Sequence, residues 1–158
     1  MGAKDFVFRL GTGLHRTVFC ASGGRLLGRA GGMPVAILTT TGRRSGRARR
    51  TMLTVPVSDG ERAVLIASYG GDSRHPAWFL NLVAEPNVNL TMGGRERPMR
   101  AREASAEERA QLWPRVVDAY RGYAAYQRRT DRQIPIVVLE PYAGGSQSSR
   151  DRGGSAWG

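Results

Sequence analysis

The sequence predicts an α+β fold, mainly antiparallel β, in which a small barrel is flanked by helices. Its runs of apolar and β-branched residues are short, and most of them are joined by turns of hairpin length. A doubly wound parallel sheet would need a helical crossover between successive strands, which this order of elements lacks. With 158 residues, of which 41% are hydrophobic, the chain has the size of one domain with one core.

Residues 1–32 are predicted to be a basic amino-terminal segment. Its apolar residues recur every fourth position, with basic residues off that stripe, as in a short amphipathic helix: Phe6, Leu10, Leu14 and Val18. Two interpretations stay open. The helix docks on the domain, or it lies on an anionic membrane or guards a lipid-like substrate. The five glycines between residues 23 and 32 then predict a flexible connection.

The barrel domain is predicted over residues 33–142. Its first three strands have short separations, which predict an antiparallel meander: residues 35–41, 51–57 and 63–68. After a loop, a helix is expected from Pro76 to Glu85, because proline suits the first turn of a helix and Pro86 would stop it.

The second half of the domain begins with a predicted hairpin over residues 88–102. Ser105 and Glu108 then form a capping box that opens a helical region reaching about residue 129. Proline lacks an amide hydrogen and glycine favours flexible backbone, so Pro114 and Gly122 should break or kink this helix.

The last strand is expected over residues 134–140, where an unbroken apolar run predicts burial on both faces. Residues 143–158 are rich in glycine, serine and arginine and have no periodicity, which predicts a disordered tail.

An arginine-rich loop between the first two predicted strands is a candidate anion site. It holds five arginines within residues 42–50, and no acidic residue occurs between Asp5 and Asp59. Gly42 and Gly46 allow tight backbone turns, while guanidinium groups suit phosphate or carboxylate. A like-charged cluster without an internal partner favours an external anion. The alternatives are a solvated turn or a nucleic-acid contact.

The composition narrows the possible chemistry. A formal net charge of +11 indicates a polyanionic partner, such as nucleic acid, an acidic membrane or a phosphate-bearing cofactor. The single Cys20 excludes an internal disulfide. One cysteine together with two histidines that lie far apart in sequence, His15 and His75, argues against a Cys/His metal site. No signal peptide or membrane span is apparent, which predicts a cytoplasmic protein. The sequence has no catalytic triad, P-loop or Rossmann fingerprint, so catalysis would need a cofactor.

Two further stretches could contribute to a site. In residues 67–71, the glycines would allow a flat ring to approach closely, and the Ser68 hydroxyl could donate a hydrogen bond. Tyr120, Tyr123 and Tyr126 recur at spacings of three, so neighbouring tyrosines would lie on adjacent sides of a helix. They suit stacking on an aromatic substrate, and ordinary half-buried aromatics are the alternative.

Five motifs in this order resemble the deazaflavin (F420)-dependent nitroreductase family: residues 39–49, 67–71, 75–82, 113–126 and 131–138. The resemblance covers roughly residues 33–141. It implies a split β-barrel fold related to FMN-binding barrels. It also implies a reductase that transfers a hydride from reduced F420 to a small electrophilic acceptor, namely a quinone, a nitroaromatic or an activated alkene.

The resemblance also implies roles for individual residues. The phosphate and acidic tail of F420 would contact four residues of the loop: Arg43, Arg44, Ser45 and Arg49. The ring would lie near four more, supported by a helix carrying Trp78 and Asn81: Met52, Ile66, Ala67 and Ser68. The substrate pocket would use four hydroxyl side chains: Ser68, Tyr120, Tyr123 and Tyr126.

Three positions depart from the family pattern. Tyr69 replaces a frequent lysine, Met52 a common proline, and Thr54 a bulky aromatic of a nitroimidazole-reducing member. Two alternatives stay open beside the reductase. One is a barrel that binds FMN, and the other is a basic nucleic-acid-binding module without catalysis, although no nucleic-acid recognition motif is present. Peripheral membrane contact would involve the amino-terminal segment, and the sequence carries no signal for an oligomeric state.

Overall fold

The computed structural model of the protein describes residues 29–30 and 32–143. Its strands are β1 (Arg29–Ala30), β2 (Met33–Thr41), β3 (Ala48–Thr54), β4 (Val57–Asp59), β5 (Arg62–Ile66), β6 (Asn87–Met92), β7 (Arg95–Glu103) and β8 (Ile136–Pro141). Its helical elements are the 3₁₀ turn η1 (Tyr69–Gly71) and the helices α2 (Ala77–Ala84), α3 (Ala106–Ala119) and α4 (Gly122–Arg128).

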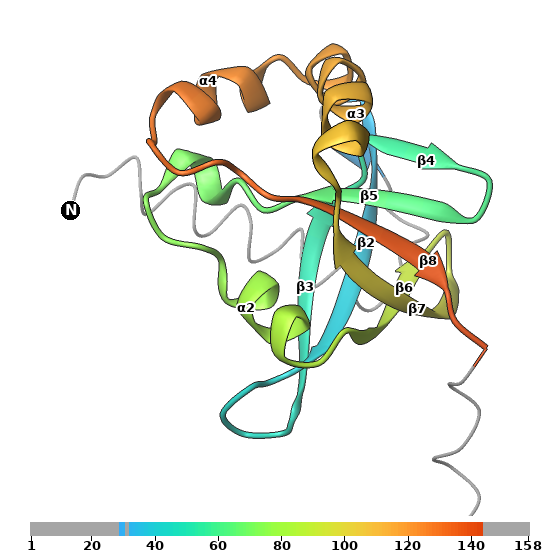
Figure 1. Ribbon diagram of the computed structural model, residues 1–158. Helices are drawn as coiled ribbons and strands as arrows, with labels where there is room; N and C mark the ends of the chain where they lie inside the picture. Colours follow the sequence, from blue (N-terminus) through green and yellow to red (C-terminus); the bar gives the residue numbers. More distant parts are fainter. Residues whose placement is uncertain (1–28, 31, 144–158) are drawn as a thin grey trace, which may run out of the picture.

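The strands form one antiparallel sheet that curves into a split barrel (Figure 1). Their order is β1-β2-β6-β7-β8-β5-β4, and β3 pairs with the other edge of β2. All the strand pairs among the described residues are antiparallel. The predicted α+β class, with helices flanking a mainly antiparallel barrel, is therefore confirmed.

Strands β3 and β4 are two parts of one bent segment, where the sequence predicted a single strand over residues 51–57. β3 pairs with β2 and β4 pairs with β5, so the predicted simple meander is wrong. The chain turns at Val55 and Pro56, since proline cannot donate to a sheet ladder. The amide of Val55 instead donates to the carbonyl of Pro34 (2.8 Å). Because β3 and β4 lie at the two ends of the sheet, this bend joins those ends covalently.

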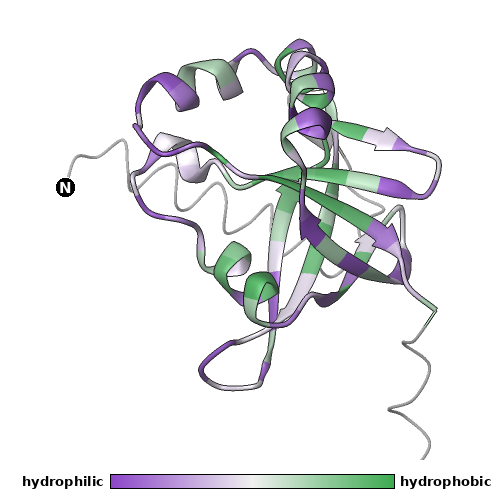
Figure 2. Cartoon of the chain, viewed as in Figure 1, coloured by the Kyte–Doolittle hydropathy of each residue, from purple (hydrophilic) through white to green (hydrophobic). Residues whose placement is uncertain are grey.

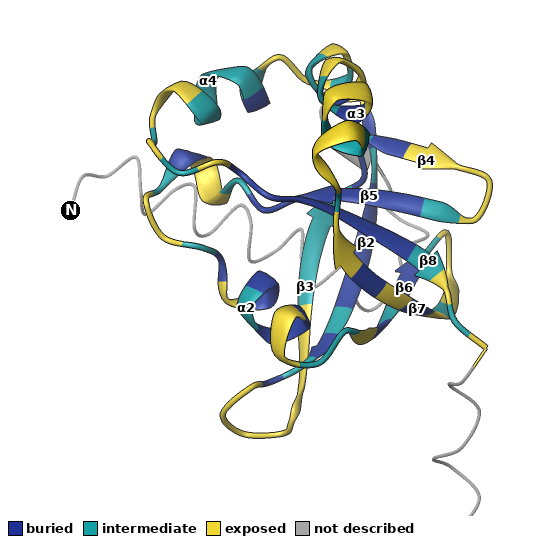
Figure 3. Ribbon diagram, in the orientation of Figure 1, coloured by how far each residue is buried: buried dark blue, intermediate teal, exposed yellow. Residues whose placement is uncertain are grey.

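Strands β5 and β8 are buried on both faces, because alternate side chains enter two different apolar clusters. The inner cluster, which the barrel strands share with α2, includes Leu65, Val137 and Leu139. The outer cluster, which β5 and β8 share with α3 and α4, includes Ile66 and Val138. These two strands are dark blue in Figure 3 and largely green in Figure 2. The prediction of a buried last strand is thus confirmed.

Helix α3 begins at the predicted capping box. The Ser105 hydroxyl accepts from the amide of Glu108 (3.2 Å), whose carboxylate accepts from the amide of Ser105 (2.9 Å). The helix continues through Pro114, where a break was predicted. Pro114 is exposed, so water can reach the carbonyl that loses its helical partner. The break occurs at residues 120–121, directly before Gly122, where the second break or kink was predicted, and Gly122 begins α4.

The predicted amphipathic helix and the predicted disordered tail lie outside the described residues, and the domain boundaries at 33 and 142 also remain predictions. Within residues 29–30 and 32–143, no helix has the length and apolar character needed to cross a membrane. The same residues contain no group of His, Cys, Asp and Glu side chains that could hold a metal ion.

Candidate functional site

The arginine-rich loop joins β2 to β3 and projects from the lower end of the molecule in Figure 1. The amide of Gly42 donates to the carbonyl of Arg47 (2.8 Å), and the amide of Gly46 donates to the carbonyl of Gly42 (2.8 Å). A Cβ atom at Gly42 would lie 2.7 Å from the Ser45 hydroxyl. Gly46 has a φ of 68°, which glycine adopts without strain. These contacts fold the loop into a compact turn whose arginines are exposed.

Asn81 of α2 anchors this loop. Its Oδ1 atom accepts from the amide of Arg43 (3.2 Å) and from the Nη1 atom of the same arginine (3.3 Å). Its Nδ2 atom donates to the hydroxyl of Thr40 on β2 (3.2 Å). Because Asn81 is buried, these bonds satisfy an amide whose desolvation would otherwise be costly. The helix predicted to support the ring thus also positions the anion loop.

An open cavity of about 610 Å³ lies between the loop, the beginning of β3 and α2. Its walls include six of the predicted cofactor-binding residues: Arg43, Arg44, Ser45, Arg49, Trp78 and Asn81. Arg50 also lines it, and no acidic residue does. The structure therefore brings the predicted anion-binding residues together around one space.

The charge of this cavity is not neutralised from within the described part of the chain. None of the five loop arginines forms an ion pair there, whereas five arginines elsewhere do: Arg62, Arg74, Arg97, Arg102 and Arg115. Unpaired guanidinium groups bind phosphate and carboxylate through charge-assisted hydrogen bonds. The cavity is therefore suited to an anionic ligand.

Ser68 lies half-buried between β5 and η1. The next three residues all have positive φ, at 46° for Tyr69, 66° for Gly70 and 83° for Gly71. Tyr69 is the residue for which this conformation is strained, since it is not glycine. A Cβ atom at Gly71 would lie 2.7 Å from the carbonyl oxygen of Tyr126. The close approach at Gly71 is thus to α4, whereas the sequence predicted an approach by a ring.

Arg132, in the segment between α4 and β8, contacts the same turn. Its Nη2 atom donates to the carbonyls of Ala67 (3.1 Å) and Ser68 (2.9 Å), and its Nε atom donates to the carbonyl of Asp72 (2.9 Å). Burial lowers the pKa of this guanidinium, which nevertheless stays protonated. Sequence reasoning assigned Arg132 no role, because a side chain that binds backbone carbonyls far away in sequence leaves no local pattern.

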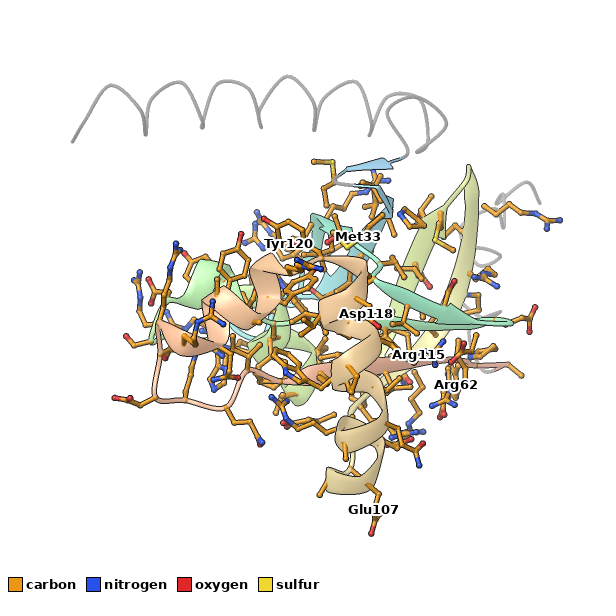
Figure 4. The ribbon with its side chains drawn as sticks, turned by 90° about the horizontal axis from the view of Figure 1, so that it is seen from above. Met33, Arg62, Glu107, Arg115, Asp118 and Tyr120 are labelled. Carbon is orange, nitrogen blue, oxygen red and sulfur yellow. The ribbon has the colours of Figure 1, made fainter. Side chains whose placement is uncertain are left out.

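The three predicted tyrosines do meet, and they form a cluster that we call the tyrosine cluster: Tyr120, Tyr123 and Tyr126. Their ring centroids lie 5.4 to 6.3 Å apart. Tyr120 lies just beyond α3, at the opposite end from Glu107 (Figure 4). Its ring folds back over Gly122, where a Cβ atom would lie 2.1 Å from a ring carbon. The cluster therefore forms around the helix break and not along one continuous helix.

The hydroxyl groups of the cluster differ in environment. Tyr123 is buried, and its hydroxyl forms a 2.8 Å hydrogen bond with that of Thr54 on β3. Burial raises the pKa of Tyr123. The pKa of Tyr126 is also raised, first by its interaction with the hydroxyl of Tyr120. Tyr120 is exposed. The raised pKa values keep the hydroxyls of Tyr123 and Tyr126 protonated at neutral pH, so both can donate hydrogen bonds.

The remaining predicted ring contacts do not line the arginine cavity. Ser68 is half-buried at the η1 turn, and Met52 packs beside Ile37 on another face of β2 and β3. Ile66 belongs to the outer cluster with Tyr123, and Ala67 belongs to the inner cluster. None of these four residues lines the cavity itself, although Ala67 shares the inner cluster with Trp78, which does.

Strand β3 connects the cavity to the tyrosine cluster. Arg49 lines the cavity, and Thr54 bonds to Tyr123 five residues further on. Five residues of extended strand span roughly 16 Å. Sequence reasoning noted Thr54 as a departure from the family but missed its contact with Tyr123. The threonine at this position could have indicated the contact, because a small polar residue in place of an aromatic leaves room for a neighbouring hydroxyl.

Comparisons with known proteins agree on one family. A family model described as F420H(2)-dependent quinone reductase matches residues 12–141. An F420H(2)-dependent quinone reductase of Mycobacterium tuberculosis (strain ATCC 25618 / H37Rv) is 36% identical over 130 residues, which cover 80% of this chain and 87% of that protein.

Two solved structures are also similar to this chain. One, described as an F420-H2 dependent reductase (FDR-A), is 41% identical with a TM-score of 0.62, over 68% of this chain and 94% of that one. Another, described as a domain-swapped dimer, is 34% identical with a TM-score of 0.66, over 88% of this chain and 100% of that one.

Proposed function

This chain belongs to the F420H(2)-dependent quinone reductase family and is therefore an oxidoreductase whose cofactor is F420, and we propose that it reduces a quinone held between Ser68 and the tyrosine cluster. The family resemblance inferred from the sequence is thereby confirmed. The alternatives of an FMN-binding barrel and a nucleic-acid-binding module are not favoured.

The observation that carries the proposal is the pair of sites connected by β3. An arginine cavity without carboxylates lies at one end of this strand, and a cluster of tyrosine hydroxyls lies at the other. We assign the phosphate and acidic tail of F420 to Arg43, Arg44, Ser45 and Arg49. A ring joined to that phosphate would then reach toward Met52, Ile66, Ala67 and Ser68, with α2 supporting it through Trp78 and Asn81.

The residues of the chain supply binding, orientation and a hydrogen-bond donor. When bound, reduced F420 supplies the hydride. The oxygen of the quinone gains negative charge as the hydride arrives, and a positioned hydroxyl stabilises that charge and provides a proton. We assign this donor role to Ser68 or Tyr123, and we assign the walls of the substrate pocket to Tyr120 and Tyr126.

Two measurements on purified protein test this proposal. In a titration at matched ionic strength, F420 should bind more tightly than FMN, and its affinity should fall as salt is added, because guanidinium groups hold it. In single-turnover oxidation of bound F420H2 by a soluble quinone, Ser68→Ala should slow the hydride step by roughly 100- to 1000-fold, as expected for the loss of one positioned donor.

Tighter binding of FMN would contradict the cofactor assignment. An unchanged single-turnover rate in Ser68→Ala would remove Ser68 from the site, and an unchanged rate in Tyr123→Phe as well would mean that the proton comes from water. These outcomes separate binding of the cofactor from the chemistry that follows.

We also propose that the amino-terminal segment brings the protein to the inner face of the membrane, where lipophilic quinones reside, so that a cytoplasmic enzyme meets its substrate there. The stripe of Phe6, Leu10, Leu14 and Val18 beside basic residues supports this proposal. Deletion of residues 1–22 should impair turnover of a long-chain quinone more than that of a soluble nitroaromatic. It should also reduce sedimentation with anionic vesicles. Equal effects on both substrates, with unchanged sedimentation, would favour a helix docked on the domain.

A further inference from the structure

Arg132 makes contacts that extend the proposed site beyond the residues assigned so far. Two of its three carbonyl partners, Ala67 and Ser68, follow β5 and lead into the η1 turn, and the third, Asp72, follows that turn. One guanidinium group therefore holds both ends of the turn that carries Ser68. The planar fork of arginine can bridge several carbonyls at once, which a lysine ammonium cannot do in the same geometry.

The turn needs such a restraint, because its backbone conformation is unusual. Tyr69 has a φ of 46°, followed by two glycines that also have positive φ. The internal hydrogen bonds of the turn are few, from the amide of Gly71 to the carbonyl of Ser68 (2.9 Å) and from that of Asp72 to the carbonyl of Tyr69 (3.2 Å). The carbonyl of Ser68 thus accepts from both Gly71 and Arg132.

The backbone of Arg132 is itself tied to α4. Its carbonyl accepts from the Nε2 atom of Gln127 (2.8 Å), and the Oε1 atom of Gln127 accepts from the amide of Ile134 (2.9 Å). Gln127 lies one residue after Tyr126, on the helix that also carries Tyr123. Arg132 therefore connects the Ser68 turn through hydrogen bonds to Gln127 of α4, the helix that carries Tyr123 and Tyr126.

Arg132 forms no ion pair among the described residues, although the charge of Asp72 acts on it and opposes the lowering of its pKa by burial. The nearest acidic side chain in the turn is that of Asp72, which is bound by Arg74 through both of its oxygens (3.0 and 2.9 Å). The Nη1 atom of Arg132 lies 3.4 Å from the Nδ1 atom of His75. The hydrogen-bond partners of this guanidinium are thus three backbone carbonyls and one imidazole, as expected of a side chain that organises backbone.

We propose that Arg132 is a positioning residue, which fixes the Ser68 hydroxyl relative to the tyrosine cluster so that both face one substrate. This inference rests on the proposed function, since it assigns Ser68 to the reacting centre. It makes two demands. The loss of Arg132 must loosen the turn in the free protein, and it must slow catalysis only through Ser68.

The first demand is tested in the free protein by hydrogen exchange. In Arg132→Lys, the amides of Gly71 and Asp72 should exchange faster than in the wild type. The matched control is Arg109→Lys. Arg109 is also partly buried, with a pKa lowered by burial. It donates to the backbone carbonyl of Ile134 (2.5 Å) and to the Oε1 atom of Gln127 (3.5 Å), and no hydrogen bond among the described residues joins it to the Ser68 turn. Arg109→Lys should leave the exchange of the turn unchanged.

The second demand is tested by a double-mutant cycle on single-turnover rates. Arg132→Lys alone should slow the hydride step on the order of 10- to 100-fold, the cost of small misplacement. In the Ser68→Ala background the same change should add less than about a 3-fold effect, because its target is already gone. The dissociation constant of F420 should change little, since the arginine cavity is elsewhere.

Several results would overturn the inference. The first is a double variant whose loss of rate equals the product of the losses in the two single variants. The second is a slow hydride step in Arg132→Lys together with a wild-type rate in Ser68→Ala. The third is wild-type hydrogen exchange of the turn in Arg132→Lys. Arg132→Gln, which keeps two N–H donors, provides a second variant. If both Arg132 variants unfold at the assay temperature while Arg109→Lys stays folded, Arg132 is a stability residue and the inference fails. A wild-type protein that does not oxidise F420H2 would instead reject the proposed function.

Discussion

Tyr123 has the most constrained hydroxyl of the tyrosine cluster, because the ring is buried and the oxygen lies 2.8 Å from that of Thr54. Either hydroxyl can be the donor in this pair. If Thr54 donates, the proton of Tyr123 is free to point at a substrate oxygen. Thr54 then acts as a support that fixes the direction of a donor, and Tyr126, nearer the surface, acts as a wall.

This division of roles predicts different outcomes for conservative substitutions. Tyr123→Phe should slow single-turnover oxidation of F420H2 by about 100-fold, since it removes a positioned donor. Tyr126→Phe should keep nearly the wild-type rate, because stacking survives, while Tyr126→Ala should raise the KM for the quinone. Stopped-flow absorbance of the bound cofactor measures the first two effects. The opposite ranking, with Tyr126→Phe the slower enzyme, would reverse the two assignments.

Thr54→Val serves as the companion variant, because it removes the hydroxyl partner while keeping the size of the side chain. We expect a smaller loss of rate than in Tyr123→Phe, since the tyrosine can still donate although its orientation is no longer fixed. A loss as large as that of Tyr123→Phe would show that Thr54 itself contributes the donor.

At the scale of the elements, the arginine-rich loop contains several arginines that line the cavity and one that does not. Arg43, Arg44 and Arg49 line the cavity, but Arg47 in the same loop does not. Arg47 contributes backbone bonds, with its carbonyl accepting from Gly42 and its amide donating to Ser45. An alanine at position 47 would keep both bonds.

Arg43→Ala, Arg44→Ala and Arg49→Ala should therefore each weaken F420 binding by about 1 to 3 kcal/mol, the scale of a charge-assisted hydrogen bond. Arg47→Ala removes the same charge from the same loop and should have a much smaller effect. Calorimetric or fluorescence titration at fixed salt makes the comparison. Equal losses in all four variants would indicate a general effect of charge and not a defined site.

The elements also show what the sequence could and could not predict. Strand β8 and the capping box of α3 were predictable, because each depends on local composition and spacing. The bend at Val55 was not, since a proline after a strand marks an end without showing that the next residues join another part of the sheet. Pro114 was misjudged for a related reason. The effect of a proline on a helix depends on whether solvent surrounds it, and this exposure is known only from the folded structure.

The candidate site likewise has a part that the sequence could predict and a part that it could not. Composition located the arginine-rich loop, whereas the cavity residues of α2, Trp78 and Asn81, were indicated only by the family resemblance. The contacts of Arg132 with the Ser68 turn connect segments more than 60 residues apart in sequence. No periodicity reports such a contact, because it depends on how the complete barrel brings β5 and β8 side by side.

At the scale of the whole molecule, strands β5 and β8 join the inner and outer clusters, because each strand contributes side chains to both. Leu139 of β8 belongs to the inner cluster, while Ile136 of the same strand belongs to the outer one. The outer cluster also contains Tyr123, so the proposed substrate pocket shares its packing with the barrel. Loss of either cluster should therefore weaken both.

Leu139→Ala and Ile136→Ala should each lower the free energy of unfolding by about 2 to 5 kcal/mol, because both side chains are fully buried and leave cavities. Val83→Ala is the control, since Val83 on α2 is 64% exposed and its loss should change stability by less than about 0.5 kcal/mol. Urea unfolding should give one transition, at the same midpoint by far-UV and near-UV circular dichroism. If near-UV signal were lost first in Ile136→Ala alone, the tyrosine cluster would unfold separately and the two clusters would be energetically independent.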